Sequence, residues 1–232
     1  MADCISVGER TYNQDGLITM HGTSFANEPA FVDAYQAARA TDSWFGGDLH
    51  WRMHVLVWAA TNALNMKGDF VECGSNRGGS ALMLVKYLGT KARGRPFYLF
   101  DTFCGMDARL SLKHEMDHYE GRYPECYEQV VKLFKPYSNV HVVRGSVPDT
   151  LIAAHIDHVA FLHIDMNAAK PERAALEYFW PKLVQGGIVI FDDYNWVFCK
   201  SQKDTIDEFA RSIGQSILCL PTGQGMLFKT KS

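Results

Sequence analysis

The sequence has no long hydrophobic run and almost no excess charge of either sign. Its longest apolar stretches, such as residues 54–60, fall far short of the roughly 18 residues that cross a membrane. Lysine and arginine number 23 and aspartate and glutamate 26, so the net charge of −3 gives no electrostatic reason to expect nucleic acid as a partner. The first residues lack the basic and apolar regions of a secretory signal. We therefore expect a cytoplasmic protein that binds no nucleic acid and no membrane.

Cysteine is sparse and follows no pattern. The six cysteines include no Cys-x-x-Cys pair and no zinc-ligand spacing, and a disulfide framework is not expected in a reducing compartment. What is present is an ordinary globular mixture, with 47% apolar and 21% charged residues in a chain of 232. That length suits one large α/β domain, or two small ones.

Strands and helices alternate from residue 69 onward. This alternation predicts βαβ units, and hence a parallel sheet covered by helices on both faces. The last two strands are separated only by the turn at 221–224, so they must pair antiparallel. We predict an α/β, Rossmann-like doubly wound sheet of seven strands, mostly parallel with an antiparallel C-terminal hairpin strand. Strands are expected at 70–73, 97–100, 140–143, 160–164, 187–191, 216–220 and 225–229, and helices at 80–88, 124–134, 150–155, 171–180 and 201–213.

The N-terminal third is organised differently. Residues 1–27 are polar and turn-rich without a clear period, whereas 29–40 and 48–66 carry apolar stripes at helical spacing. We therefore divide the chain into an N-terminal helical lid or cap at 1–67 and a single α/β unit at 68–232. The apolar helices of the first part offer a surface for a homodimer.

A glycine-rich turn follows the first strand of the alternating region. Its order, Gly-x-x-x-Gly-Gly over 74–79, differs from the Gly-x-Gly-x-x-Gly dinucleotide fingerprint. Asp101 ends the next strand, where a carboxylate can accept hydrogen bonds from both ribose hydroxyls of an adenosine ligand. Ser146, in the turn after the third strand, is placed to line the adenine. These features fit either S-adenosylmethionine or a nicotinamide dinucleotide.

Three acids form the sharpest constellation. Asp165 ends the fourth strand of the alternating region, and Asp192 and Asp193 end the fifth. One helix links these strands, so we expect them to be neighbours that bring the carboxylates together. Bare carboxylates in a cleft repel one another, and a hard divalent cation such as Mg²⁺ relieves that repulsion. The competing interpretation is a helix N-cap beside an exposed acidic pair.

The motifs of residues 50–229 resemble the macrocin O-methyltransferase family. Its members are class I S-adenosylmethionine-dependent enzymes that methylate sugar hydroxyls of antibiotics. The segments that carry the resemblance are Val71-Glu72-Cys73-Gly74, Arg77-Gly78-Gly79-Ser80, Asp101-Thr102-Phe103-Cys104-Gly105, His163-Ile164-Asp165, Pro181-Lys182-Leu183, Gly186-Gly187 and Asp192-Asp193-Tyr194.

The resemblance implies roles for these residues. It makes Asp165, Asp192 and Asp193 the ligands of a divalent metal. The family often has a second acid two residues after the first, as a proposed general base, but this chain has Asn167, which takes no proton at neutral pH. The residues implied to hold S-adenosylmethionine are Glu72, Gly74, Ser75, Arg77, Ser80, Asp101 and Phe103, together with Ser146.

The general base is therefore open. We predict Asp165 and His163 as the catalytic residues, because His163 shares strand parity with Asp165. A hydrogen-bonded core histidine is the competing interpretation of His163. The other candidate bases are Lys170, Tyr194, His21 and His50.

Three functions compete at this point. The leading hypothesis is a metal-dependent O-methyltransferase that uses S-adenosylmethionine and Mg²⁺ on a small-molecule hydroxyl, either of a secondary-metabolite sugar or of a phenol. A nicotinamide-dependent oxidoreductase explains Asp101 and the glycine turn but leaves the three acids without a role. A non-catalytic methyltransferase-like binding domain gains weight from Asn167.

Overall fold

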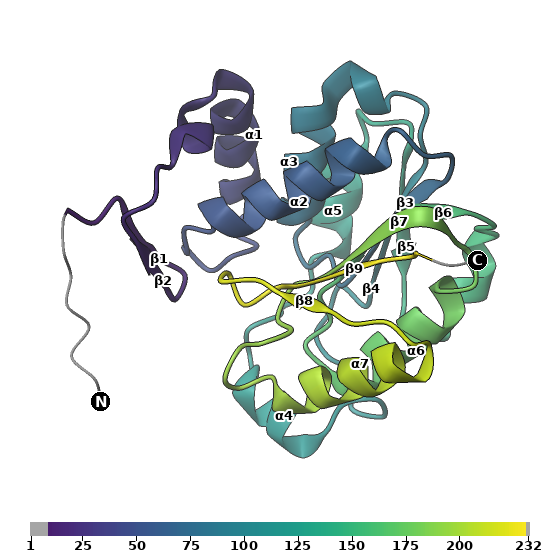
Figure 1. The fold of residues 1–232 in the computed structure, drawn as a ribbon. Coiled ribbons are helices and arrows are strands. Elements are labelled where there is room, and N and C mark those ends of the chain that lie inside the picture. The colour runs from purple at the N-terminus through teal and green to yellow at the C-terminus, as the bar shows by residue number, and fades with distance from the viewer. Residues whose placement is uncertain (1–8, 231–232) are drawn as a thin grey trace, which may run out of the picture.

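The computed structural model describes residues 9–230, and its centre is a seven-stranded sheet (Figure 1). The strand order is β5-β4-β3-β6-β7-β9-β8, in which β9 alone runs antiparallel to its neighbours. The predicted fold class is therefore confirmed, including the C-terminal hairpin. The strands are β3 (Asp69–Cys73), β4 (Phe97–Asp101), β5 (Val140–Arg144), β6 (Val159–Ile164), β7 (Leu183–Phe191), β8 (Leu218–Cys219) and β9 (Gly225–Phe228).

Helices cover both faces of the sheet, as the uninterrupted apolar strands predict. One buried cluster joins α1, α2, α3 and α5 to one face, and a second joins α6 and α7 to the other. Figure 1 shows the two layers above and below the sheet. The helices are α1 (Pro29–Arg39), α2 (His50–Ala63), α3 (Gly79–Leu88), α4 (Lys113–His118), α5 (Tyr127–Phe134), α6 (Ala169–Phe179) and α7 (Lys200–Ser212), with short 3-10 turns η1 (Ser24–Asn27), η2 (Gly89–Ala92) and η3 (Leu151–Ala154).

The N-terminal third contains a small hairpin that the sequence analysis did not predict. Strands β1 (Tyr12–Gln14) and β2 (Leu17–Thr19) pair antiparallel around Asp15 and Gly16, which both have positive φ angles of 52° and 70°. An Asp-Gly pair in that conformation is the standard two-residue turn of a β-hairpin. The strands are too short for their alternation to stand out from a polar background. Helix α4 also escaped prediction, since its six residues are almost all polar.

Helices α1 and α2 belong to the same packed core as the sheet. Residues of both helices are buried in one cluster with Phe70 and Phe161 of the strands. The proposed division at residue 67 thus coincides with no gap in this packing. Helix α2 lies directly over the face of the sheet at β6 and β7, which places its side chains above the ends of those strands.

The strand order reverses between β3 and its two neighbours. From β3 the chain continues to β4 on one side of it, whereas β6 pairs with β3 on the other side. The loops that follow β3 and β6 therefore lead away from each other and leave a crevice between them. Such a crevice is where open α/β sheets bind ligands. No helix within residues 9–230 has the length and hydropathy needed to cross a membrane.

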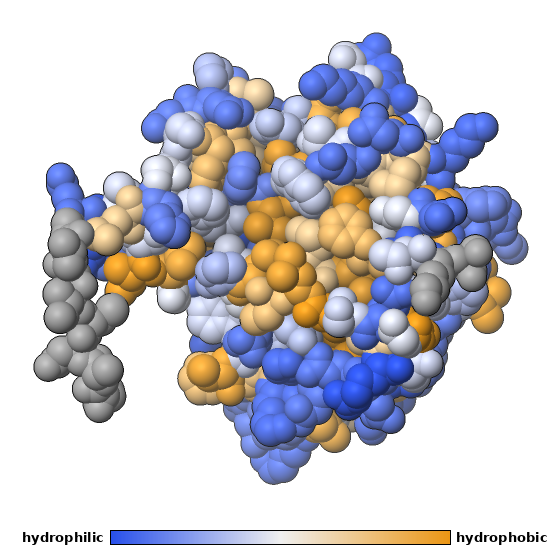
Figure 2. Space-filling model, in the orientation of Figure 1, coloured by the Kyte–Doolittle hydropathy of each residue, from blue (hydrophilic) through white to orange (hydrophobic). Residues whose placement is uncertain are grey.

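Hydrophobic side chains gather on the outer face where α2 meets the strands β8 and β9 (Figure 2). Trp58 is 45% exposed there, and its ring meets that of Phe228 edge-on. The predicted homodimer would find an apolar surface at this place, and the dimer stays a prediction.

Candidate active site

The loop after β3 crosses the end of β6 at very close range. Gly74 has a φ of +92°, and a Cβ atom at this position would overlap the carbonyl oxygen of Asp165. The backbone N–H of Asp165 also donates to the carbonyl of Cys73 at 2.8 Å. Only glycine allows this crossing. It places the loop that begins at Gly74 beside Asp165.

Asp101 holds this loop in place. Its Oδ2 accepts the backbone N–H groups of Ser75 and Asn76 at 2.7 and 2.8 Å, and its Oδ1 accepts that of Phe103 at 2.6 Å. Burial raises the pKa of Asp101, and the three backbone donors oppose that rise. The carboxylate therefore organises the turn, and it lines the cleft beside the turn as well.

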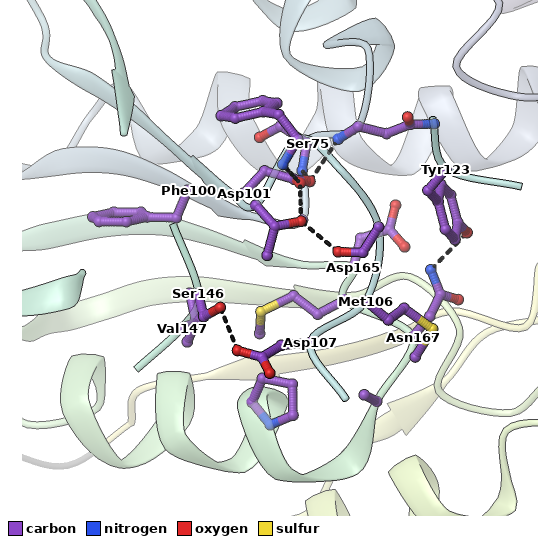
Figure 3. A pocket seen from close by; sticks show the side chains of 18 of the residues that line it. Ser75, Phe100, Asp101, Met106, Asp107, Tyr123, Ser146, Val147, Asp165 and Asn167 are labelled. Carbon is purple, nitrogen blue, oxygen red and sulfur yellow. Dashed lines mark hydrogen bonds between the residues drawn. The ribbon is translucent and has the colours of Figure 1, made fainter. Parts of the chain in front are cut away.

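A cleft opens between the loops that follow β3, β4, β5 and β6 (Figure 3). Two of the eight predicted cofactor residues do not line it. Glu72 is buried against His163, and Arg77 pairs with Asp42 at 2.6 Å near the surface. The six that do line the cleft are Gly74, Ser75, Ser80, Asp101, Phe103 and Ser146.

Two buried polar atoms in the cleft wall lack a partner among residues 9–230. They are the Ser75 Oγ and the Asn167 Oδ1. Buried polar atoms are normally hydrogen-bonded, so these two are suited to bind a polar ligand. The cleft thus fits a cofactor that carries donors and acceptors at both the β3 and the β6 side.

Asp107 and Tyr123 also line the cleft, although no motif in the sequence marks them. Asp107 accepts a hydrogen bond from Ser146 Oγ at 2.6 Å, and Tyr123 accepts one from Asn167 Nδ2 at 3.0 Å (Figure 3). Both lie in the long segment between β4 and α5, which carries no strand or helix periodicity near them. Their proximity to the cleft depends on how that segment folds back.

The three predicted aspartates converge. One carboxylate oxygen from each of Asp165, Asp192 and Asp193 lies within 4.8 Å of the others. The neighbouring positions of β6 and β7 in the sheet produce this arrangement. Burial, Asp192 and Asp193 together raise the pKa of Asp165 well above its usual range. The N-cap of α6 is Ala168 and not Asp165, and the side chains of Asp192 and Asp193 are only 9% and 16% exposed, so the competing interpretation of a helix N-cap beside an exposed pair does not describe these acids.

Arg52 of α2 meets the same cluster and was missed at the sequence level. Its Nη1 donates to Asp192 Oδ2 at 2.5 Å and to Asp193 Oδ1 at 2.9 Å. The available signal was a single arginine in a largely apolar helix, α2, that has no other lysine, arginine, aspartate or glutamate. Such a residue is rarely buried unless it is paired. Periodicity indicates that it needs a partner but cannot say which one.

A cation remains compatible with the cluster after Arg52 is counted. Asp15 also pairs with Arg52, so three carboxylates share one guanidinium, and the Asp165 carboxylate is not among them. Within the described residues, the Asp165 side chain has no hydrogen-bond partner. Carboxylate oxygens such as those of this cluster are the ligands that Mg²⁺ prefers. The donor set therefore fits a divalent cation.

His163 lies fully buried in β6 between two carboxylates. Its Nδ1 is 2.9 Å from Glu72 Oε1, and its Nε2 is 3.6 Å from Asp192 Oδ1. Burial alone would lower the pKa of His163, but its interactions with the Asp192 and Glu72 carboxylates raise it to about 10. With no exposed surface and no place in the cleft lining, the ring is not positioned to take a proton from a substrate.

The other candidate bases lie apart from the cleft lining. Lys170 is exposed on α6, and His21 is exposed in the loop before α1. The Tyr194 hydroxyl donates to Asp207 at 2.6 Å, and His50 stacks on Tyr35. None of these four residues contributes to the wall of the cleft.

Residues 50–216 match the family model described as Macrocin-O-methyltransferase (TylF), which covers more than half of the chain. The chain is 29% identical over 160 residues to demethyldecarbamoylnovobiocin O-methyltransferase of Streptomyces niveus, a match that covers 62% of this chain and 59% of the relative. It is 30% identical over 162 residues to 8-demethyl-8-(2,3-dimethoxy-alpha-L-rhamnosyl)-tetracenomycin-C 4'-O-methyltransferase of Streptomyces olivaceus, covering 64% and 60%. The matches thus span less than two thirds of either relative's length.

Solved structures share the fold. The O-methyltransferase NovP superposes with a TM-score of 0.67 at 24% identity, covering 78% of this chain and 80% of that one. The calicheamicin methyltransferase CalS11 superposes with a TM-score of 0.65 at 17% identity, covering 87% and 93%. These likenesses establish a Rossmann-like methyltransferase fold.

Proposed function

Because this chain belongs to the macrocin O-methyltransferase family, we propose that it transfers the methyl group of S-adenosylmethionine to a hydroxyl of a small molecule, with a divalent cation held by Asp165, Asp192 and Asp193. The observation that carries the proposal is the double position of Asp165. It lines the cleft, and its carboxylate also belongs to the aspartate cluster. A cleft for a methyl donor and a cluster for a cation thus share one residue.

The cleft residues would hold the methyl donor. We assign Gly74, Ser75 and Asp101 to the β3 and β4 side of the cofactor, with Phe103 and Ser146 farther along the same cleft. Bound S-adenosylmethionine supplies a methyl group already activated on a sulfonium, so the protein has mainly to align an acceptor oxygen with it. Glu72 and Arg77, which face away from the cleft, would act through the loop they flank.

The aspartate cluster would hold Mg²⁺ or another hard divalent cation. Such a cation supplies positive charge that lowers the pKa of an acceptor hydroxyl. The chain's own contribution to proton removal falls to Asp165, because it is the aspartate of the cluster that faces the cleft and Asn167 cannot accept a proton. We assign His163 the role of holding Asp192, in place of the general base expected from strand parity.

The acceptor class follows from the relatives. One relative is named for a rhamnosyl group that it methylates at the 4' hydroxyl, and another for a novobiocin precursor. We therefore propose a sugar hydroxyl of a secondary metabolite as acceptor. A phenol is the second candidate, because the positive charge of the cation would ionise a phenol hydroxyl more easily than a sugar hydroxyl. The nicotinamide-dependent alternative leaves the aspartate cluster without a purpose.

One set of measurements tests the proposal. Calorimetry with S-adenosylhomocysteine and with NAD should show binding of the first only. Mass spectrometry should show a gain of one methyl group on a glycosylated aromatic acceptor when S-adenosylmethionine and Mg²⁺ are present. Binding of NAD, or full methyl transfer in excess chelator, would respectively remove the cofactor assignment and the metal assignment.

A further inference from the structure

Arg52 is buried between the N-terminal hairpin and the aspartate cluster. Its side chain is 8% exposed, although it carries a full charge. Nε and Nη2 donate to the two oxygens of Asp15 at 2.8 and 3.2 Å, and Nη1 donates to Asp192 and Asp193. The guanidinium carbon also lies 4.9 Å from the ring centre of Trp196. Arg52 therefore links segments that are far apart in the chain.

The guanidinium plane matches its three partners in a way that a point charge could not. One edge forms a bidentate pair with Asp15, and the remaining nitrogen holds two neighbouring carboxylates at once. A planar fork with fixed donor directions makes this possible, whereas lysine has one compact ammonium on a flexible stem. Arg52 can thus set the orientation of its partners in addition to neutralising them.

The hairpin turn fits the rest of this arrangement. A Cβ atom at Gly16 would lie 3.0 Å from the Trp196 ring, so the turn packs directly on that ring. Asp15, at the same turn, is the residue that forms the ion pair with Arg52. The hairpin therefore restrains the guanidinium from the side opposite the aspartate cluster.

Arg52 holds two of the three candidate metal ligands. Asp192 is secured on both oxygens, since Gln224 Nε2 donates to its Oδ1 at 2.9 Å while Arg52 donates to its Oδ2. Asp193 is secured on Oδ1 by the same Arg52 nitrogen. The Asp193 Oδ2 and the Asp165 carboxylate remain available to a ligand.

We propose that Arg52 is a positioning residue for the divalent cation: it fixes Asp192 and Asp193 beside Asp165, and Asp15 fixes Arg52. This inference rests on the proposed function, because it needs a cation at the aspartate cluster. Outer partners of metal ligands commonly change metal affinity by about 10- to 100-fold when they are replaced. The same size of effect is expected here.

Charge and geometry make different predictions for this residue. A nearby positive charge, acting through space alone, opposes a cation, so its removal would tighten cation binding. A charge-conserving replacement, Arg52→Lys, should then change nothing. If Arg52 acts by geometry, Arg52→Lys weakens cation binding even though the charge is kept.

The test is calorimetric titration of Mn²⁺ into the wild-type protein and its Arg52→Lys variant, with electron paramagnetic resonance counting the bound ions. We expect Arg52→Lys to raise the Kd for Mn²⁺ by about 10-fold or more. Arg173→Lys is the matched control, because Arg173 pairs with Glu177 on α6, away from the cluster, and its replacement should leave the Kd unchanged. The affinity for S-adenosylhomocysteine should stay within about twofold in both variants, since Arg52 is not part of the cleft wall.

The outcomes separate the two proposals. If the wild-type protein binds no Mn²⁺, the metal part of the proposed function fails, and the positioning role of Arg52 fails with it. If the wild-type protein binds Mn²⁺ and Arg52→Lys binds it equally well or more tightly, only the positioning role is overturned. Should Arg52→Lys not fold, Asp15→Glu takes its place in the titration. It keeps every charge but lengthens by one methylene the side chain that holds Arg52. A Kd that is raised severalfold supports the role, and an unchanged Kd overturns it.

Discussion

Glu72 and His163 lie side by side on adjacent parallel strands, with Glu72 Oε1 2.9 Å from His163 Nδ1 and both side chains buried. The register of the sheet pairs these two positions and continues to Ile190, so all three face the layer of α2. The contact continues through Asp192 to Arg52. A buried polar chain therefore connects the middle of the sheet to the N-terminal hairpin.

Removing Glu72 should destabilise the protein. Glu72→Ala would leave His163 without one of its two buried partners, and breaking a buried pair costs about 3–5 kcal/mol. Glu72→Gln keeps an acceptor for His163 and should cost less. Urea denaturation of the two variants checks the order, and equal stability of Glu72→Ala and the wild type would contradict the role that we give to this pair.

Replacing the aspartates should separate catalysis from cofactor binding. Asp192 lies outside the cleft wall. Asp192→Ala should therefore abolish methyl transfer while the Kd for S-adenosylhomocysteine changes little. Asp204→Ala, on the exposed surface of α7, serves as the control and should behave as the wild type. Turnover measured by mass spectrometry, with calorimetry alongside, checks both statements. An Asp192→Ala variant with normal turnover would remove the aspartate cluster from the mechanism.

Gly74→Ala should be far more damaging than an ordinary glycine replacement at positive φ. The new Cβ would meet the backbone of Asp165, which cannot move without separating β3 from β6. Gly94→Ala is the matched control, since its φ is +83° and nothing lies within 4 Å of the new atom. We expect about 1–2 kcal/mol for Gly94→Ala from backbone strain and clearly more for Gly74→Ala. Similar denaturation midpoints for the two variants would refute the steric argument.

Asp101→Asn should loosen the turn that follows β3. In the wild type, both carboxylate oxygens of Asp101 accept backbone N–H groups. In the variant, one of these oxygens is replaced by an NH₂ group, which is a donor and would face a backbone N–H that has lost its acceptor. An unsatisfied buried donor costs about 1–3 kcal/mol. We expect that loss in urea denaturation together with weaker binding of S-adenosylhomocysteine. An unchanged affinity would show that the turn keeps its shape without the carboxylate.

A divalent cation should stabilise the folded protein. A ligand present at 100 times its Kd adds about 2.7 kcal/mol when it binds the native state alone. Thermal unfolding with Mg²⁺ or Mn²⁺ should therefore give a higher Tm than unfolding in chelator, and Asp165→Ala should abolish the difference. A Tm that does not respond to either cation in the wild type would argue against a metal site.

The order of strands and helices after residue 69 is readable in the chain because it depends on local features. Runs such as 160–164 are apolar throughout, as strands covered on both faces must be, and the segments between them have helical periodicity. Parallel strands bring their carboxyl ends to one edge, so the meeting of Asp165 with Asp192 also followed from the order of elements. The weakly patterned pieces, β1–β2 and α4, did not stand out.

The partners of Arg52 and His163 could not be found this way. Arg52 contacts Asp15 across 37 positions of the chain and Asp192 across 140, and no local pattern encodes either contact. His163 looked like a candidate base until burial and two flanking carboxylates showed it to be held inside the sheet. Strand ends and periodicity are properties of short segments, whereas the pairing of buried charges depends on which helix packs over which strands. For this chain, that packing placed Arg52 of α2 over the aspartates.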